Sequence, residues 1–186
     1  TKADIQKKLR VGFVSGDLRS HPVGYFLEGL LTELRASQLE LFAYPSFVSG
    51  DAVAARLKSL FNSWTPLVGL TDEQSAKLIY DDKIDVLIDL SGHTQHNRLP
   101  VFAFKPAPVQ VSWLGYYAST GLMEMEYLLG DPYETPEYDA THFSEKIWRL
   151  PESFLCFTPP RCSVPVGPLP ALANQFFTFG CFNDLS

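Results

Sequence analysis

The chain has 186 residues, 46% of them hydrophobic and 13% aromatic, which is enough to bury one substantial core. Its formal net charge is -6, and its fifteen Lys and Arg residues are scattered. This argues against a nucleic-acid partner, because phosphate binding needs clustered basic side chains. Since no apolar run reaches the roughly 20 residues of a membrane span and the first ten residues do not resemble a signal peptide, we expect a cytoplasmic protein without a membrane partner.

The three cysteines lie late in the chain, at Cys156, Cys162 and Cys181. They have neither the C-x-x-C spacing nor the nearby His pair of a zinc site. We expect buried or incidental thiols, which fits a reducing compartment.

Strand and helix patterns alternate from residue 9 onward. Residues 9–15 are a β-branched and aromatic run, and residues 22–34 carry apolar side chains at helical spacing. The run 84–90 is almost continuously apolar, as expected for a strand covered on both faces. The further expected elements are strands at 39–44, 64–68, 109–113, 127–130 and 146–150 and helices at 51–61 and 72–81. Because helices supply the long crossovers of parallel strands, the pattern predicts an α/β fold with a Rossmann-like, doubly wound, mostly parallel sheet.

The composition changes after Pro151. Five prolines fall within the twelve residues 159–170, and no helical period survives, which predicts a linker over 152–174. The aromatic run 176–182 then predicts a strand that begins a second domain. We therefore expect a connection at 1–8, a Rossmann-like domain at 9–151, the linker at 152–174, and the start of a truncated domain at 175–186.

Ligands of open α/β sheets bind beyond the carboxyl ends of the strands, and the first such loop holds His21. Pro22 suits the first helical position, which places His21 at or beside the N-cap. The positive helix end would keep the imidazole neutral and able to accept a proton as a general base. The alternative is that His21 only caps the helix, and both interpretations remain open.

Two further polar loops follow strands. Residues 91–98 combine hydroxyl, imidazole, amide and guanidinium groups, which suits a ligand site or, equally, a solvated turn in which Asn97 caps a short helix. A metal site from His93 and His96 is less favoured, since no third ligand is evident. Residues 113–121 contain two glycines that would let a ligand approach backbone N–H groups, while their aromatic residues suit a core or wall better than a sugar platform.

The chain contains no Asp-x-Asp pair of the kind that binds a metal in many sugar-nucleotide enzymes. The nearest approach is Glu124-Met125-Glu126, whose acidic residues share a face only in an extended segment. A metal-dependent site of the Asp-x-Asp kind is therefore not supported. We expect no metal, and we expect no other cofactor.

An ordered set of motifs resembles the O-linked N-acetylglucosamine transferase (SPINDLY-like) family, and its bacterial members most closely. The motifs are Gly16-Asp17-x-x-x-His21-Pro22, Asp89-Leu90-Ser91-Gly92-His93-Thr94, Arg98, Lys105-Pro106-Ala107-Pro108-Val109-Gln110, Trp113-Leu114-Gly115-Tyr116, Ser119-Thr120-Gly121, Tyr127-Leu128-Leu129-Gly130-Asp131-Pro132 and Phe143-Ser144-Glu145-Lys146. Each motif alone is weak, but their order and spacing together are specific.

The resemblance implies a GT-B type enzyme with two Rossmann-like domains, of which this chain supplies the N-terminal one. The missing C-terminal lobe would hold most of the uridine diphosphate, and tetratricopeptide repeats would precede the chain. The implied catalytic residue is His21. The implied donor-binding or substrate-binding residues are His93, Thr94, Arg98, Gly115, Tyr116, Ser119, Thr120 and Gly121.

The function that the resemblance implies is inverting, metal-independent transfer of N-acetylglucosamine from its uridine diphosphate donor (UDP-GlcNAc) to Ser or Thr hydroxyls of proteins. The alternatives are an N-glucosyltransferase, a transferase with another acceptor, or a non-catalytic module that binds sugar nucleotides or proteins. Since half of the catalytic region is expected to be missing, this chain alone should have little or no transferase activity.

Overall fold

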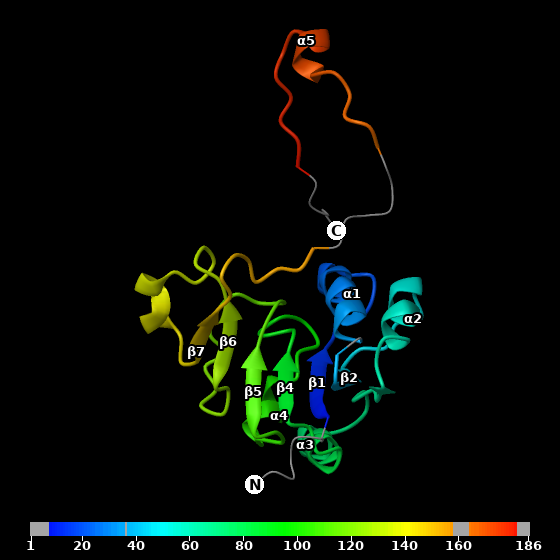
Figure 1. Cartoon of the computed structure of the whole chain (residues 1–186), viewed down its shortest axis with the longest axis vertical. Helices are drawn as coiled ribbons and strands as arrows, with labels where there is room; N and C mark the ends of the chain where they lie inside the picture. The colour runs from blue at the N-terminus through cyan, green and yellow to red at the C-terminus, as the bar shows by residue number, and fades with distance from the viewer. Residues whose placement is uncertain (1–7, 36, 158–163, 182–186) are drawn as a thin grey trace.

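The structure is a computed structural model that describes residues 8–35, 37–157 and 164–181. Its centre is a sheet of seven strands in the order β3-β2-β1-β4-β5-β6-β7, and every neighbouring pair is parallel (Figure 1). The strands are β1 (Leu9–Ser15), β2 (Leu39–Pro45), β3 (Ser63–Trp64), β4 (Val86–Asp89), β5 (Val109–Ser112), β6 (Tyr127–Gly130) and β7 (Lys146–Arg149). The predicted α/β fold with a parallel sheet is confirmed.

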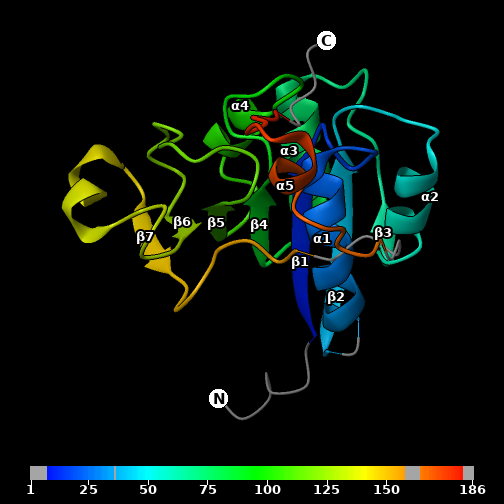
Figure 2. The same cartoon turned by 90° about the horizontal axis from the view of Figure 1, so that it is seen from above.

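Helices cover both faces of the sheet, and each face has its own core (Figure 2). On one face, Phe13 and Leu41 pack with α1 (Pro22–Leu34) and α2 (Ala52–Lys58). On the other face, the alternate strand residues pack with α3 (Asp72–Asp81) and α4 (Leu99–Ala103). The period of two along β1 and β2 therefore separates the two cores.

Side-chain caps explain where the longer helices begin. Thr71 accepts a hydrogen bond from Gln74 N–H, and the Gln74 side chain accepts one from Thr71 N–H, which forms a complete capping box at α3. Asp51 caps α2 through the N–H of Ala54 at 2.8 Å. Each cap residue immediately precedes the first residue of its helix.

Several element bounds differ from the sequence prediction. The helix expected at 51–61 ends at Lys58, and the strand expected at 64–68 is only Ser63–Trp64. Beyond Trp64 the chain still donates to β2, from Thr65 N–H to Ala43 O and from Leu67 N–H to Pro45 O at 2.8 Å each, but these bonds do not extend the strand. The short helix α4 was predicted only by the alternative in which Asn97 caps a short helix. The 3-10 helix η1 (Glu137–His142) was not predicted.

The C-terminal segment corrects two predictions. A short helix, α5 (Pro170–Asn174), lies inside the expected linker, and the described part of the expected strand, 176–181, forms no strand. A strand needs a neighbour to satisfy its backbone, and residues 176–181 are exposed with no neighbouring strand in the described chain. Figure 1 shows the segment 164–181 extending beyond the carboxyl edge of the sheet. Residues 1–7 of the connection expected at 1–8 and the strand end at Phe182 lie outside the described residues, and the domain division remains a prediction.

The two described cysteines, Cys156 and Cys181, are free and exposed. Of the two alternatives, buried or incidental thiols, the first is therefore wrong for both cysteines, and incidental thiols fit. Within the described chain, no helix is both long enough and apolar enough to cross a membrane.

Candidate functional site

The switch point of the sheet lies between β1 and β4. From β1 the chain proceeds outward to β2 and β3, and it then returns to add β4 on the other side of β1. Loops that leave adjacent strands in opposite directions form the usual ligand site of a doubly wound sheet. A buried hydrogen bond of 3.2 Å from Gly16 N–H to the Ser91 hydroxyl joins the two loops here.

The loop after β1 is built around a buried carboxylate. Asp17 is 6% exposed, and its Oδ1 accepts a hydrogen bond of 3.0 Å from Arg19 Nη2. His21 Nε2 lies 3.8 Å from the same oxygen, beyond hydrogen-bond distance. Arg19 also stacks over the ring of Phe47, with 5.1 Å from its guanidinium carbon to the ring centroid. Asp17, Arg19 and His21 therefore form one cluster at the mouth of the switch point.

The predicted position of His21 is confirmed, since it is the N-cap of α1 and Pro22 is the first helical residue. Its Nδ1 accepts a hydrogen bond of 3.3 Å from Val23 N–H. Burial lowers the pKa of His21 below its usual 6.5; Asp17 raises this pKa, and Arg19 lowers it. The imidazole is therefore neutral near pH 7, as expected, and burial is the largest cause.

The loop after β4 is fixed by Asp89, which the sequence analysis did not assign to the site. Asp89 is fully buried, and its carboxylate accepts N–H bonds from Ser91 at 3.2 Å and Gly92 at 2.7 Å. Burial raises the pKa of Asp89 to about 6, while the two N–H groups and nearby His93 lower it. An aspartate two residues before a Ser-Gly pair is the recognisable pattern of such a turn.

The other residues considered in this loop, Thr94, His93 and His96, each contact a different part of the chain. The Thr94 hydroxyl donates to Ser91 O at 2.7 Å, which tightens the turn. The exposed ring of His93 meets Tyr116 edge to face at 5.4 Å, whereas His96 packs on Phe47 at 4.8 Å. Across the described ranges, no three His, Cys, Asp or Glu side chains come together as a metal site would require.

Arg98 points into the fold. Its guanidinium donates to Asp72 Oδ1 at 2.8 Å, to Ser75 Oγ at 2.8 Å, and to the carbonyl oxygens of Leu67 and Leu70 at 3.1 Å each. These bonds tie the start of α4 to the start of α3. Arg98 therefore stabilises the scaffold here, and its substrate-binding role remains a prediction.

The loop after β5 packs directly on the loop after β4. A Cβ added to Gly115 would lie 1.8 Å from Leu90 O, and one added to Gly92 would lie 2.3 Å from Tyr116 Cβ. Leu114, with a φ of 75°, adopts the left-handed conformation that non-glycine residues rarely occupy. The glycines thus allow two backbone segments to approach each other, and they place Gly115 and Tyr116 against Leu90 and Gly92 of the loop after β4.

The Ser119-Thr120-Gly121 turn is held elsewhere, by Glu145. Thr120 N–H donates to Glu145 Oε1 at 2.7 Å, and Gly121 N–H donates to Ser119 Oγ at 3.1 Å. These N–H groups, like that of Gly115, already have acceptors within the chain, so the donor-binding role of the three residues remains a prediction. Glu145, which immediately precedes β7, was missed because nothing in the sequence shows what it contacts.

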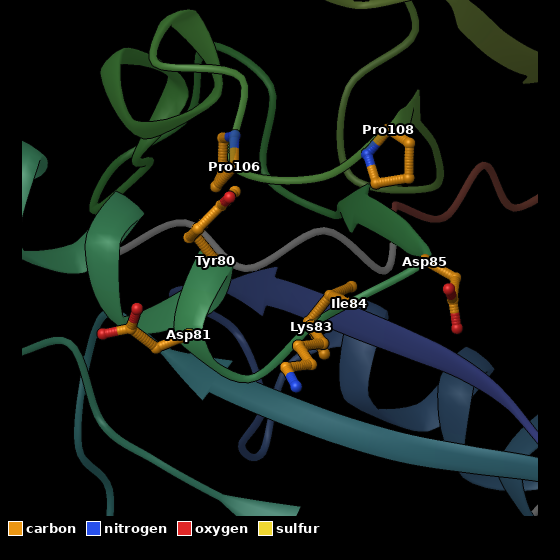
Figure 3. Close-up of a pocket in the computed structure, with 7 residues that line it drawn as sticks. All are labelled: Tyr80, Asp81, Lys83, Ile84, Asp85, Pro106 and Pro108. Carbon is orange, nitrogen blue, oxygen red and sulfur yellow. The ribbon is translucent and has the colours of Figure 1, made fainter.

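A separate cavity of about 370 Å³ lies at the amino edge of the sheet, where α3 ends and β4 and β5 begin (Figure 3). It is lined by Tyr80, Asp81, Lys83, Ile84, Asp85, Pro106 and Pro108. None of the predicted site residues belongs to it, and it faces away from the switch point.

Comparisons with known proteins agree with this geometry. The sequence profile described as Glycosyl transferase family 41 matches residues 1–158. The chain is 39% identical over 185 residues to a probable UDP-N-acetylglucosamine–peptide N-acetylglucosaminyltransferase SPINDLY of Hordeum vulgare, covering 97% of this chain and 20% of that protein. It is 30% identical over 189 residues to the probable transferase SEC of Arabidopsis thaliana, covering 96% of this chain and 19% of that protein.

Among solved structures, an O-GlcNAc transferase mutant of Thermobaculum terrenum superposes with a TM-score of 0.80 at 40% identity, covering 83% of this chain and 30% of that one. The chain thus spans about a fifth of the length of the curated relatives it matches.

Proposed function

Because this chain belongs to glycosyl transferase family 41, we propose that the whole protein transfers N-acetylglucosamine from UDP-GlcNAc to Ser or Thr hydroxyls of proteins. The observation that supports this proposal most strongly is the 39% sequence identity, over nearly the full chain, to a relative that is named for this transfer. In this proposal the chain is the N-terminal catalytic lobe, and the second lobe and any repeats lie in the rest of the protein. The transfer inverts the anomeric carbon and uses no metal.

The proposed reaction is a direct displacement. The acceptor hydroxyl oxygen attacks the anomeric carbon on the face opposite the donor phosphate. The bond from that carbon to the phosphate oxygen breaks and leaves its electron pair on uridine diphosphate, while the hydroxyl proton passes to a base. We assign His21 as the catalytic residue of this lobe because it stands at the switch point, is partly exposed, and is neutral near pH 7.

The N-cap bond sets which nitrogen of His21 is available. Because Nδ1 accepts the Val23 N–H, neutral His21 carries its proton on Nε2, which then donates to a substrate oxygen. His21 accepts the hydroxyl proton only if this bond, long at 3.3 Å, is released. A base must be neutral, so the base role predicts activity that persists to below pH 6.5 and then falls as His21 is protonated.

The test uses the full-length protein, labelled UDP-GlcNAc and cell extract, with and without a chelator. We expect transfer to survive the chelator and to fall roughly 100-fold or more in His21→Ala. The matched control is His142→Ala, because His142 is exposed on η1, outside the switch-point loops. Unchanged transfer in His21→Ala would overturn the assignment of His21, and mass spectrometry of the acceptor identifies the sugar that is added.

A further inference from the structure

The segment 115–121 is anchored at both ends. At its start, Gly115 and Tyr116 pack against the backbone of the loop after β4. At its end, Ser119 and Thr120 bond to Glu145. Only two residues separate these anchors, and one of them, Tyr117, is 72% exposed and stacks on Tyr116 with 5.9 Å between ring centroids. The position of the exposed ring therefore depends on both anchors.

Glu145 is 5% exposed and uses both carboxylate oxygens. Its Oε1 accepts from the N–H of Thr120 at 2.7 Å and also from the Thr120 hydroxyl. Its Oε2 accepts from the hydroxyls of Ser119 at 2.8 Å and Ser144 at 3.3 Å. A buried carboxylate with this many donors holds its partners strongly, because hydrogen bonds to a charged acceptor are stronger than neutral ones.

The pattern of donors favours a carboxylate at this position. Ser119 Oγ accepts from Gly121 N–H at 3.1 Å and from Ser144 N–H at 3.2 Å, so both of its lone pairs are used. Its proton goes either to Glu145 Oε2 at 2.8 Å or to Ser144 Oγ at 2.9 Å. A glutamine has one acceptor oxygen. If its NH₂ group faces Thr120, it meets the Thr120 N–H. If the NH₂ group faces Ser119, it meets an oxygen whose lone pairs are already used, and only Ser144 Oγ is left to accept from it.

We propose that Glu145 is a positioning residue of the transferase, which fixes the segment 115–121 and its Tyr116–Tyr117 pair beside the switch point. This rests on the proposed function, in which the segment borders the donor and acceptor. Glu145 acts through the loop and does not touch the substrate itself. A displacement of about 1 Å in such a segment lowers catalysis by up to about 100-fold.

The test compares Glu145→Gln with Glu152→Gln in the full-length protein. Glu152 is exposed and has no side-chain partner among the described residues, so it is a matched control. We expect Glu145→Gln to lower kcat/KM roughly 10-fold or more, with the KM for the donor and kcat measured separately. The kinetic assays are run under conditions in which circular dichroism shows that each variant is folded, so that unfolding does not contribute to a loss of activity.

Ser119→Ala provides a second variant, and the double variant completes a cycle. Ser119→Ala removes one of the facing donors, so Glu145→Gln should cost less in that background than in the wild type. If Glu145→Gln does not fold, Ser119→Ala alone should still lower kcat/KM several-fold without loss of folding. Kinetics of Glu145→Gln equal to those of Glu152→Gln, or of Ser119→Ala equal to the wild type, would overturn the proposal.

Hydrogen exchange separates this inference from the proposed function. Amides of 115–121 should exchange faster in Glu145→Gln than in Glu152→Gln, whether or not any transfer occurs. An inactive wild type with this faster exchange would contradict the transferase function and leave Glu145 as the holder of the loop. An active wild type with unchanged exchange would contradict only the role of Glu145.

Discussion

At the carboxyl edge of the sheet, Asp89 and Asp131 are buried and accept hydrogen bonds from backbone N–H groups of the loops after β4 and β6. At the amino edge, three more exposed carboxylates pair with Lys or Arg side chains, whereas Glu145, just before β7, is buried and accepts from the Thr120 N–H. The amino-edge pairs are Arg10–Glu40, Lys77–Asp81 and Lys105–Glu126. The buried and the exposed carboxylates therefore use the same chemical group in different ways.

The difference shows what each edge requires. A solvent-exposed ion pair contributes little to stability, since water screens it and two long side chains must be ordered. A buried carboxylate that accepts backbone N–H groups fixes the path of a loop, and its removal leaves buried donors unpaired. Asp89, Glu145 and Asp131 thus hold the loops after β4, β5 and β6 in one conformation.

The largest effect should come from the backbone contact at Gly115. In Gly115→Ala the new Cβ would meet Leu90 O at 1.8 Å, so the loops after β4 and β5 must separate. We expect a loss of at least about 3 kcal/mol in the free energy of unfolding, measured by urea denaturation of this chain. Gly50→Ala is the control, because nothing lies within 4 Å of its added Cβ. Equal midpoints for the two variants would show that the carboxyl edge is looser than described.

Asp89 gives an intermediate effect that depends on pH. Its pKa is about 6 in the folded chain against the usual 3.8, so between these pH values the folded state holds the proton more tightly. The free energy of unfolding therefore falls as pH rises from 4 to 7, by about 2–3 kcal/mol from this group. Asp89→Asn cannot ionise, so its stability relative to the wild type should rise over the same range. A constant difference across that range would contradict the raised pKa of Asp89.

The smallest effect should come from the amino edge. Lys77 and Asp81 form an ion pair of 2.8 Å along α3 with side chains 73% and 57% exposed. We expect Lys77→Ala to leave the melting temperature of the chain unchanged within error at 0.15 M salt, because exposed pairs are screened. A clear drop in the melting temperature would remove the contrast between the two edges.

Much of the fold follows from local patterns. The period of two in β1 and β2, the apolar run before Ser91 and the caps at Thr71 and His21 each depend on residues close in sequence, so they were predictable. The failure of residues 176–181 to form the expected strand was not predictable, because a strand depends on a distant partner that its own residues do not specify. The prolines of the expected linker did not prevent the helix α5 from forming, since Pro170 occupies its first turn.

The candidate site was predictable only in part. His21 and the loop 91–94 follow strands that the sequence identifies, and the switch-point rule brings them together. Neither the strand pattern nor the switch-point rule predicts where a side chain points. Arg98 points into the scaffold, and Glu145 points toward the loop at 119–121. Both depend on contacts between residues more than twenty positions apart.

The hydrogen bond between Gly16 and Ser91 also bears on how the chain folds. Seventy-five residues separate its two partners, and β1 pairs with β4 across the same separation. Closing a loop of this length costs entropy before any native contact compensates for it, so contacts of high sequence separation form slowly. Until β4 pairs with β1, the edge of β1 that faces it is unpaired. The switch point is therefore complete only once β4 and the loop after it are in place, whereas Asp17 and Val23, the neighbours of His21, come from its own stretch of chain.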